Sequence, residues 1–137
     1  MILERFIYAQ QYSYKIAYQE LQNGYKESHW MWFIFPQYKG LGYSSTAKYY
    51  AIQSKEEALA YAQHPLLGKR LVELSNILLS LESDDASYIM GSPDDLKLKS
   101  CMTLFYIVTK EAIFQKVLDK FYHGQYDQKT IELLEME

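Results

Sequence analysis

The chain has 137 residues, with 14 lysines and arginines against 17 aspartates and glutamates, so its net charge is −3. This acidic balance argues against a nucleic-acid-binding protein, which needs a basic surface for phosphate contacts. The single cysteine, Cys101, cannot form an intramolecular disulfide, as is usual in a reducing compartment. The longest apolar run is far shorter than the ~20 residues that cross a bilayer, and the N-terminus lacks a secretory pattern. We therefore expect one cytoplasmic domain over residues 1–137, with no nucleic-acid or membrane partner.

Helical spacing dominates the first part of the chain. Apolar residues from Leu3 to Leu21 recur three and four positions apart, and an Asn-Gly pair then gives a stop signal. Residues 29–35 are nearly all apolar or aromatic, so periodicity does not choose between a short strand and a brief helix capped by Ser28. The next two stretches are predicted to be a loop and a short helix, residues 36–45 and 46–52.

Stronger helix signals follow. The Ser54-x-x-Glu57 capping box starts one helix, and a long apolar helix runs to Leu81. Residues 83–91 are predicted to be a turn. The motif Ser92-Pro93-Asp94-Asp95 then offers a capping hydroxyl, a first-turn proline and carboxylates that suit the helix dipole. With two more helices at residues 112–121 and from Asp127, we predict an all-α fold, a compact single-domain bundle of about six to eight mostly short helices.

Both tryptophans, Trp30 and Trp32, lie in an uncharged run that ends at a Pro-Gln turn. An apolar anchor that leads directly into a polar loop can support a core, line a pocket, or do both. The sequence leaves open which of these the two indoles do.

The three histidines do not have the spacing of a zinc site, so we expect no metal. His64 precedes a helix start and His123 a helix end, and both are expected to be structural. His29 adjoins the tryptophans and is a candidate general acid or base. The alternative is a partly buried histidine bonded to the backbone.

Two glycine-containing loops are suited to hold an anion. In the first, Gly40-x-Gly42-x-Ser44, backbone amides can approach a ligand just ahead of a predicted helix. It is not a dinucleotide fingerprint, because Ser45 stands where a third glycine is needed. The loop at Gly91 is not a P-loop, which needs a second glycine directly before its lysine.

Beyond the second loop, Lys97, Ser100 and Thr103 fall on one face of a predicted helix. A lysine with hydroxyls one turn away can hold a phosphate or a carboxylate, or position a hydroxyl nucleophile. The alternative is an ordinary solvent-exposed helix face. Asp94 and Asp95, in the first turn, are candidate general acids or bases.

Long motifs run nearly from one end of the chain to the other, among them residues 28–37, Gly40-Leu41-Gly42, His64-Pro65-x-Leu67-Gly68 and residues 91–98. On these motifs the chain resembles domain-of-unknown-function family 1810, whose members sometimes carry the label calpastatin. The resemblance implies a helical fold and supplies no established activity. A calpastatin-type inhibitor is expected to be a long, polar, disordered chain, whereas 49% of this chain is apolar.

A second resemblance concerns the segment from Gln63 to Leu67 with the leucines that follow it. It is similar to a helix start in the NADAR superfamily, which is associated with NAD and ADP-ribose metabolism. By analogy, this resemblance implies cleavage of a glycosidic bond.

Together these observations predict a pocket for a small polar or anionic ligand of nucleotide or ADP-ribose type, formed by residues 29–44 and 92–103. If the protein is an enzyme, we expect a hydrolase or an N-glycosidase-like activity, without a cofactor. The alternative is a non-enzymatic interaction or self-association module, forming a homo-oligomer through an exposed aromatic surface. The predicted catalytic residues are His29, Asp94 and Asp95, and the predicted ligand-binding residues are Trp30, Trp32, Gln37, Gly40, Gly42, Ser44, Lys97 and Ser100.

Overall fold

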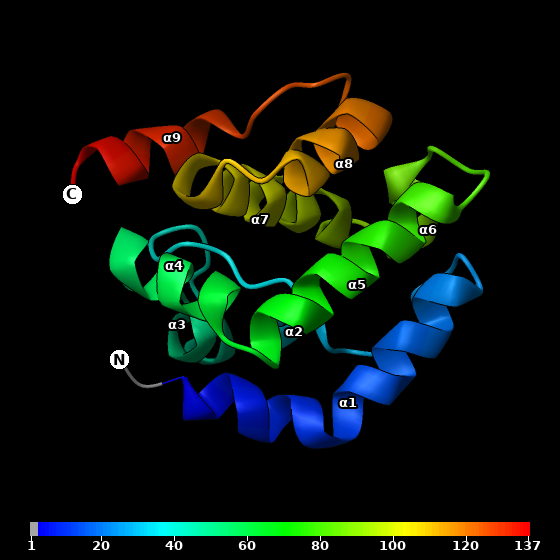
Figure 1. Cartoon of the computed structure of the whole chain (residues 1–137), viewed down its shortest axis with the longest axis horizontal. Coiled ribbons are helices and arrows are strands. Elements are labelled where there is room, and N and C mark those ends of the chain that lie inside the picture. The colour runs from blue at the N-terminus through cyan, green and yellow to red at the C-terminus, as the bar shows by residue number, and fades with distance from the viewer. Residues whose placement is uncertain (1–2) are drawn as a thin grey trace.

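The computed structural model describes residues 3–137, which fold into nine α-helices (Figure 1). These residues form no strand, and their one β-type contact is an isolated bridge between Tyr38 and Ile52. The predicted all-α fold is confirmed, and none of the described helices could span a membrane. The helices are α1 (Glu4–Gln22), α2 (Met31–Ile34), α3 (Ser45–Tyr50), α4 (Lys55–Gln63), α5 (Leu67–Ser80), α6 (Ala86–Met90), α7 (Asp94–Thr109), α8 (Ala112–Tyr122) and α9 (Gln128–Glu135).

The described chain holds nine helices rather than the predicted six to eight, partly because the predicted turn at residues 83–91 contains α6. The Asp85 side chain accepts a hydrogen bond from the backbone N–H of Tyr88 at 3.0 Å and so caps this helix. Ile89 and Met90 are buried against the core. Packing therefore stabilises a single helical turn that helix propensity alone would not hold.

The sequence left open whether residues 29–35 form a strand or a helix. Residues 31–34 form the short helix α2. The predicted cap at Ser28 is wrong. The N-cap position is Trp30, which makes no side-chain cap, and the Ser28 hydroxyl instead donates to Glu20 at 2.5 Å.

The predicted cap at Ser92 is also wrong. Helix α7 begins at Asp94, and its N-cap position, Pro93, makes no side-chain hydrogen bond. The backbone takes over this role, since the N–H of Asp95 donates to the carbonyl of Gly91 at 2.9 Å. The two carboxylates of the motif do lie in the first turn, as predicted.

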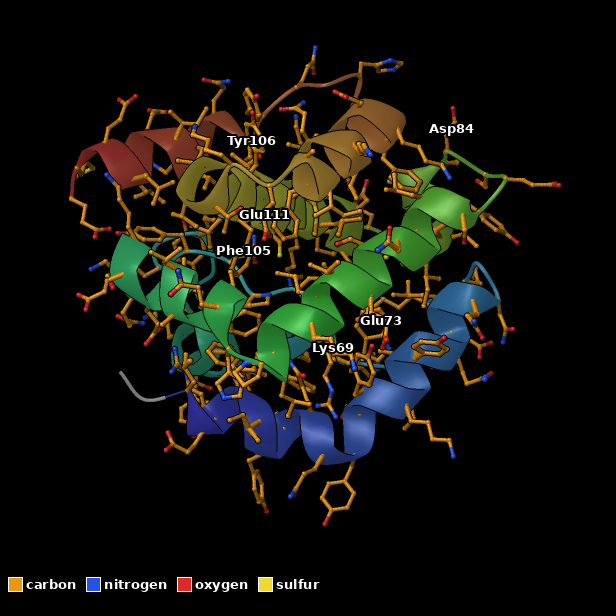
Figure 2. The ribbon with its side chains drawn as sticks, viewed as in Figure 1. Lys69, Glu73, Asp84, Phe105, Tyr106 and Glu111 are labelled. Atoms are coloured by element: carbon orange, nitrogen blue, oxygen red, sulfur yellow. The ribbon has the colours of Figure 1, made fainter. Side chains whose placement is uncertain are left out.

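Helix α7 packs against α4, α6, α8 and α9 and so forms the centre of the molecule. Figure 2 shows Phe105 of this helix in the middle of the bundle. Burial raises the pKa of the Cys101 thiol well above its ordinary value, so Cys101 is an inert core residue. The fully buried residues of α7 are Leu98, Cys101, Met102, Thr103, Leu104 and Phe105.

Helix α1 forms one edge of the molecule and packs against α5 (Figure 1). Between them the hydroxyl of Tyr14 donates to Glu73, which lies on the side of α5 that faces α1 (Figure 2). Deeper in the bundle, the buried amide of Gln10 donates to the Tyr61 hydroxyl of α4 at 3.0 Å. Polar contacts therefore fix α1 against both α4 and α5.

The corner between α4 and α5 depends on a glycine and a histidine. A Cβ atom at Gly68 would lie 1.9 Å from the carbonyl oxygen of Ala62, so no other residue fits without moving the backbone. The Nδ1 atom of His64 accepts from the backbone N–H groups of Leu66 and Leu67 at 3.1 and 3.2 Å. The structural role predicted for His64 is thus present at the start of α5.

The capping box before α4 is present, with one difference. Ser54 accepts from the N–H of Glu57 at 3.0 Å, as predicted. The carboxylate of Glu57 reaches past Ser54 to the N–H of Gln53 at 3.1 Å and also binds Arg5 at 2.7 Å. The cap of α4 thereby holds the start of α1.

The carboxylate of Glu20, only 8% exposed, fixes the chain where it leaves α1. It accepts from the backbone N–H groups of Glu27 and Ser28 at 2.9 Å each, from the Ser28 hydroxyl at 2.5 Å and from the indole N–H of Trp30 at 2.8 Å. Burial by itself would raise the pKa of this carboxyl, but the hydrogen bonds outweigh burial and lower it. The start of the aromatic segment is therefore held against α1 by a buried charge.

We expect Glu20→Gln to lower the free energy of unfolding by about 2–4 kcal/mol near neutral pH, because the amide removes the charge that four donors share and keeps one acceptor oxygen in place of two. The folded-state pKa of Glu20 lies below its ordinary value of 4.5. The carboxylate therefore stabilises the fold fully above that value and loses its effect as pH falls through the folded-state pKa. Urea unfolding should show the gap between wild type and variant shrinking in acid. The exposed neighbour Glu27 supplies the control Glu27→Gln, and a gap that stays constant with pH would contradict the assignment.

Candidate functional site

A cavity of about 380 Å³ lies where the segment leading into α3 meets the first turns of α7. We call it the Lys97 cavity. Its volume is within the range of about 300–1,000 Å³ that is typical of small-molecule sites. The segment before and into α3 contributes Gln37, Leu41, Gly42, Tyr43, Ser44 and Ala47, and the α7 side contributes Pro93, Leu96, Lys97 and Ser100.

The backbone from Gln37 to Lys39 is anchored to Ile52, which follows α3. The carbonyl of Gln37 accepts from the N–H of Ile52 at 2.8 Å, and the N–H of Lys39 donates to the carbonyl of Ile52 at 2.9 Å. The buried Tyr38 between them donates its hydroxyl to Glu137. Burial and this hydrogen bond raise the pKa of Tyr38 to about 12. Gln37 therefore enters the cavity from a fixed piece of backbone.

Ser44 and Gly42 shape the loop side of the cavity. The Ser44 hydroxyl accepts from the N–H of Ala47 at 3.0 Å and so caps α3. A Cβ atom at Gly42 would lie 2.6 Å from the Cβ of Ala47, which makes glycine a packing requirement at this position. Both residues thus have a structural reason to be there, and both also line the cavity.

Lys97 is the only cationic side chain among the described residues that line this cavity. Its Nζ lies 5.6 Å from the ring centroid of Trp32 and 3.7 Å from Oδ1 of Asp94. The other oxygen of Asp94 lies 2.9 Å from Nζ of Lys26. The cavity's single cation is therefore held between an aromatic ring and a carboxylate that a second lysine already binds.

The hydroxyl of Ser100 lies one turn after Lys97 and donates to the carbonyl of Leu96 at 3.1 Å. Its oxygen is left to accept a hydrogen bond from a ligand. Thr103, predicted on the same face, is fully buried, and its Oγ1 accepts from the N–H of Asp127 at 2.9 Å. The three residues of the predicted face are therefore used differently. Lys97 and Ser100 line the cavity, and Thr103 binds the segment before α9.

The two tryptophans have different surroundings. Trp30 is 1% exposed and its indole donates to Glu20, so it belongs to the core and does not line the Lys97 cavity. Trp32 is half-buried and lines a narrow hollow that shares Gln37 and Gly42 with the cavity. Trp30 is therefore a core residue, and Trp32 is part of the wall of the neighbouring hollow.

Gly40 and Asp95 line other hollows. Gly40, with φ +96°, lies beside Leu133 of α9, and both line a hollow of about 450 Å³. Asp95 lines a hollow of about 460 Å³ together with Lys120 of α8 and His123, which follows α8. Its Oδ1 is buried with no hydrogen-bond partner in the described part of the chain. These two predicted site residues are therefore not brought to the Lys97 cavity.

His29 is exposed and is absent from the lining of the Lys97 cavity. Its neighbours on both sides, Ser28 and Trp30, are held by Glu20. Asp94 is also absent from the lining, although it is joined to Lys97. Within residues 3–137 no group of three His, Cys, Asp or Glu side chains is placed to hold a metal ion.

Several lining residues were missed by the sequence prediction. Tyr43 stands between two predicted residues, and it lines the cavity while 84% exposed. Leu96 is 60% exposed and lies directly before Lys97. On a helix Leu96 points away from Leu98 and Phe105, and an apolar residue outside the apolar face of a predicted helix is a signal that the sequence carried.

Comparisons with known proteins give a family but no activity. The family model described as a protein of unknown function, DUF1810, matches residues 1–134, which confirms the predicted resemblance. Among solved structures, the crystal structure of the conserved hypothetical protein Rv1873 from Mycobacterium tuberculosis is similar, with a TM-score of 0.95 and 47% identity. That match covers 97% of this chain and 96% of the other. A comparison with curated proteins finds no match.

We expect Gly42→Ala to lower the free energy of unfolding by about 1–3 kcal/mol, because its Cβ would overlap that of Ala47. Ala47→Gly alone should cost about 1 kcal/mol through helix propensity. The double variant should be more stable than the sum of the two losses implies, because the clash is gone. Urea unfolding of the four proteins gives this coupling, and strict additivity would show that the two residues do not meet.

Proposed function

The chain belongs to the DUF1810 family of proteins of unknown function, and we propose that it binds a small polar ligand with an anionic group in the Lys97 cavity. The observation that supports this proposal is that polar residues from two distant segments of the chain line one cavity. Polar residues of the loop, Gln37 and Ser44, line the same cavity as Lys97 and Ser100 of α7, about 60 positions away along the chain.

The lining groups suit a ligand of nucleotide or ADP-ribose type. The Lys97 ammonium is a donor for a phosphate or carboxylate oxygen. The amide of Gln37 and the hydroxyls of Ser44 and Ser100 match the hydroxyl groups of a sugar. The exposed ring of Tyr43 offers a face on which a planar base can stack.

The proposal extends to hydrolysis, of the hydrolase or N-glycosidase-like kind, only through Asp94. A general acid or base must reach the reacting group within hydrogen-bond distance or through one water. The described residues that line the cavity include no carboxylate and no imidazole. Asp94 lies one ion pair away, with its Oδ1 3.7 Å from Lys97, whereas Asp95 lines a different hollow. Binding is therefore the primary function proposed, and catalysis by Asp94 is secondary.

A thermal-shift screen against nucleoside monophosphates and ADP-ribose tests the proposal. A ligand at ~100 times its dissociation constant should stabilise the fold by roughly 2.7 kcal/mol. Gln37→Ala and Lys97→Ala should lose the shift, because they remove polar groups that line the cavity. Chromatography of the same samples would reveal a released base or phosphate.

The matched control is Lys99→Ala. Lys99 is also a lysine of α7, but its Nζ lies 6.0 Å from the Tyr122 ring centroid and it does not line the cavity. A shift that survives Lys97→Ala, or that disappears equally with Lys99→Ala, would place the ligand elsewhere.

A second function, self-association, is favoured by the outer face of α1. Tyr8, Tyr12 and Ile16 recur every four residues on this edge helix and are 72%, 76% and 47% exposed. No other helix covers this edge in the view of Figure 1. An aromatic stripe of this kind is typical of an interaction surface.

The charges on α1 point to a second copy of the chain as the partner. Glu4 and Lys15 are both exposed and share the face of the stripe. An antiparallel pairing that sets Tyr8 against the partner's Tyr12 also brings Glu4 next to the partner's Lys15. Stable interfaces bury about 1,200–2,000 Å² of accessible surface in total, and a pair of single helix faces buries less, so the dimer should be weak.

Sedimentation over a range of concentrations tests this second function. Glu4→Lys should weaken the dimer by placing like charges together, and Glu4→Lys combined with Lys15→Glu should restore it. Neither change touches the Lys97 cavity. A wild-type chain that stays monomeric throughout, or a double variant that fails to recover, would rule the pairing out.

A further inference from the structure

A chain of three charges ends at the Lys97 cavity. Nζ of Lys26 lies 2.9 Å from one oxygen of Asp94, and Nζ of Lys97 lies 3.7 Å from the other. The two side chains of the first pair are 7% and 20% exposed, and that of Lys97 is 28% exposed. The three charges therefore act in a largely desolvated setting, where pairing matters more than it does in open water.

Asp94 cannot easily leave this position. Besides Asp94, the Lys26 ammonium donates to the carbonyl of Ser28 at 2.5 Å and lies 4.7 Å from the ring centroid of Trp30. The backbone N–H of Lys26 also donates to the carbonyl of Ile89 at 2.7 Å. Since Lys26 is fixed from several sides, the carboxylate that it binds stays beside Lys97.

The charge balance sets how much negative charge the cavity can take. Within this chain of charges two lysines face one aspartate, which leaves one positive charge for a ligand. The Glu20 carboxylate, near the Lys26 end, does not line the cavity and is compensated by its own four donors. The other lining residues described above, Gln37, Tyr43, Ser44 and Ser100 among them, carry no charge that could add to it. A single anionic group brings the local sum to zero, whereas a second negative charge would remain unpaired in a half-buried site. No arginine is among the described residues that line the cavity, so none there can bind a phosphate with two parallel hydrogen bonds.

We propose that the Lys97 cavity selects a ligand whose bound group carries one negative charge, a phosphodiester or a carboxylate, and that Asp94 sets this limit. The inference rests on the function proposed for the cavity and narrows its ligand class. Asp94 acts here as a positioning and selectivity residue. It shares the Lys97 ammonium with the ligand and repels each further negative charge.

Two probes of nearly the same shape test the proposal, adenosine 5′-monophosphate and its methyl phosphodiester. Above the second phosphate pKa of about 6, the first carries about two negative charges and the second carries one. Calorimetric titration should show wild type binding the diester more tightly. Asp94→Asn keeps the side-chain shape and removes the charge 3.7 Å from Nζ of Lys97. The ratio of the two dissociation constants should therefore shift about three- to tenfold toward the monophosphate.

The ratio within one variant is the informative measurement, because a purely structural loss would weaken both probes alike. Asp95→Asn removes a neighbouring charge that does not contact Lys97 and should leave the ratio unchanged. If neither probe binds, the function proposed for the cavity is overturned and this inference with it. If both bind but wild type prefers the dianion, or if Asp94→Asn leaves the ratio where it was, only the charge selection is overturned.

Discussion

The arrangement of the first half of the chain depends on the hydrogen bonds of the buried Glu20 carboxylate. It gathers two backbone N–H groups, a hydroxyl and the indole of Trp30 onto one side chain of α1. A charge in so little solvent is stable only when several donors compensate it. These hydrogen bonds therefore fix the position of the segment that follows α1, and the Trp30 side chain enters the core there. The chain then turns through α2 toward Gln37 with its starting point fixed.

The same region connects the core to the candidate site. Lys26 sits over the Trp30 ring and binds Asp94 at the start of α7, and Asp94 in turn reaches Lys97. A run of charges thus passes from the buried interior to the wall of a cavity. Because each member restrains the next, the position of Lys97 depends on contacts that also stabilise the fold. Asp94 therefore takes part both in the stability of the fold and in the ligand preference proposed for the cavity.

The candidate site was partly predictable from residue chemistry. Lysine and serine one helical turn apart, and a glycine loop ahead of a helix, are the residue types that an anionic ligand needs, and the structure brings Gln37, Gly42, Ser44, Lys97 and Ser100 to one cavity. What residue type could not indicate is direction. Two glycines of one motif, only two positions apart, line different hollows, because the loop turns at a positive φ and then packs against α3. Adjacent carboxylates separate in the same way, since neighbours on a helix point about 100° apart.

By itself the sequence determined the class of the fold, the long helices and the capping box at Ser54, because helical periodicity and capping are local and are written in residues three and four apart. Only the tertiary structure decided that α6 forms, that Ser28 serves Glu20 instead of a helix end, and which tryptophan is core. Each of these outcomes depends on a partner distant in the sequence or on burial, and a local pattern cannot specify either. The Lys97 cavity is of this second kind. Its chemistry was present in two separate segments, and packing alone set them face to face.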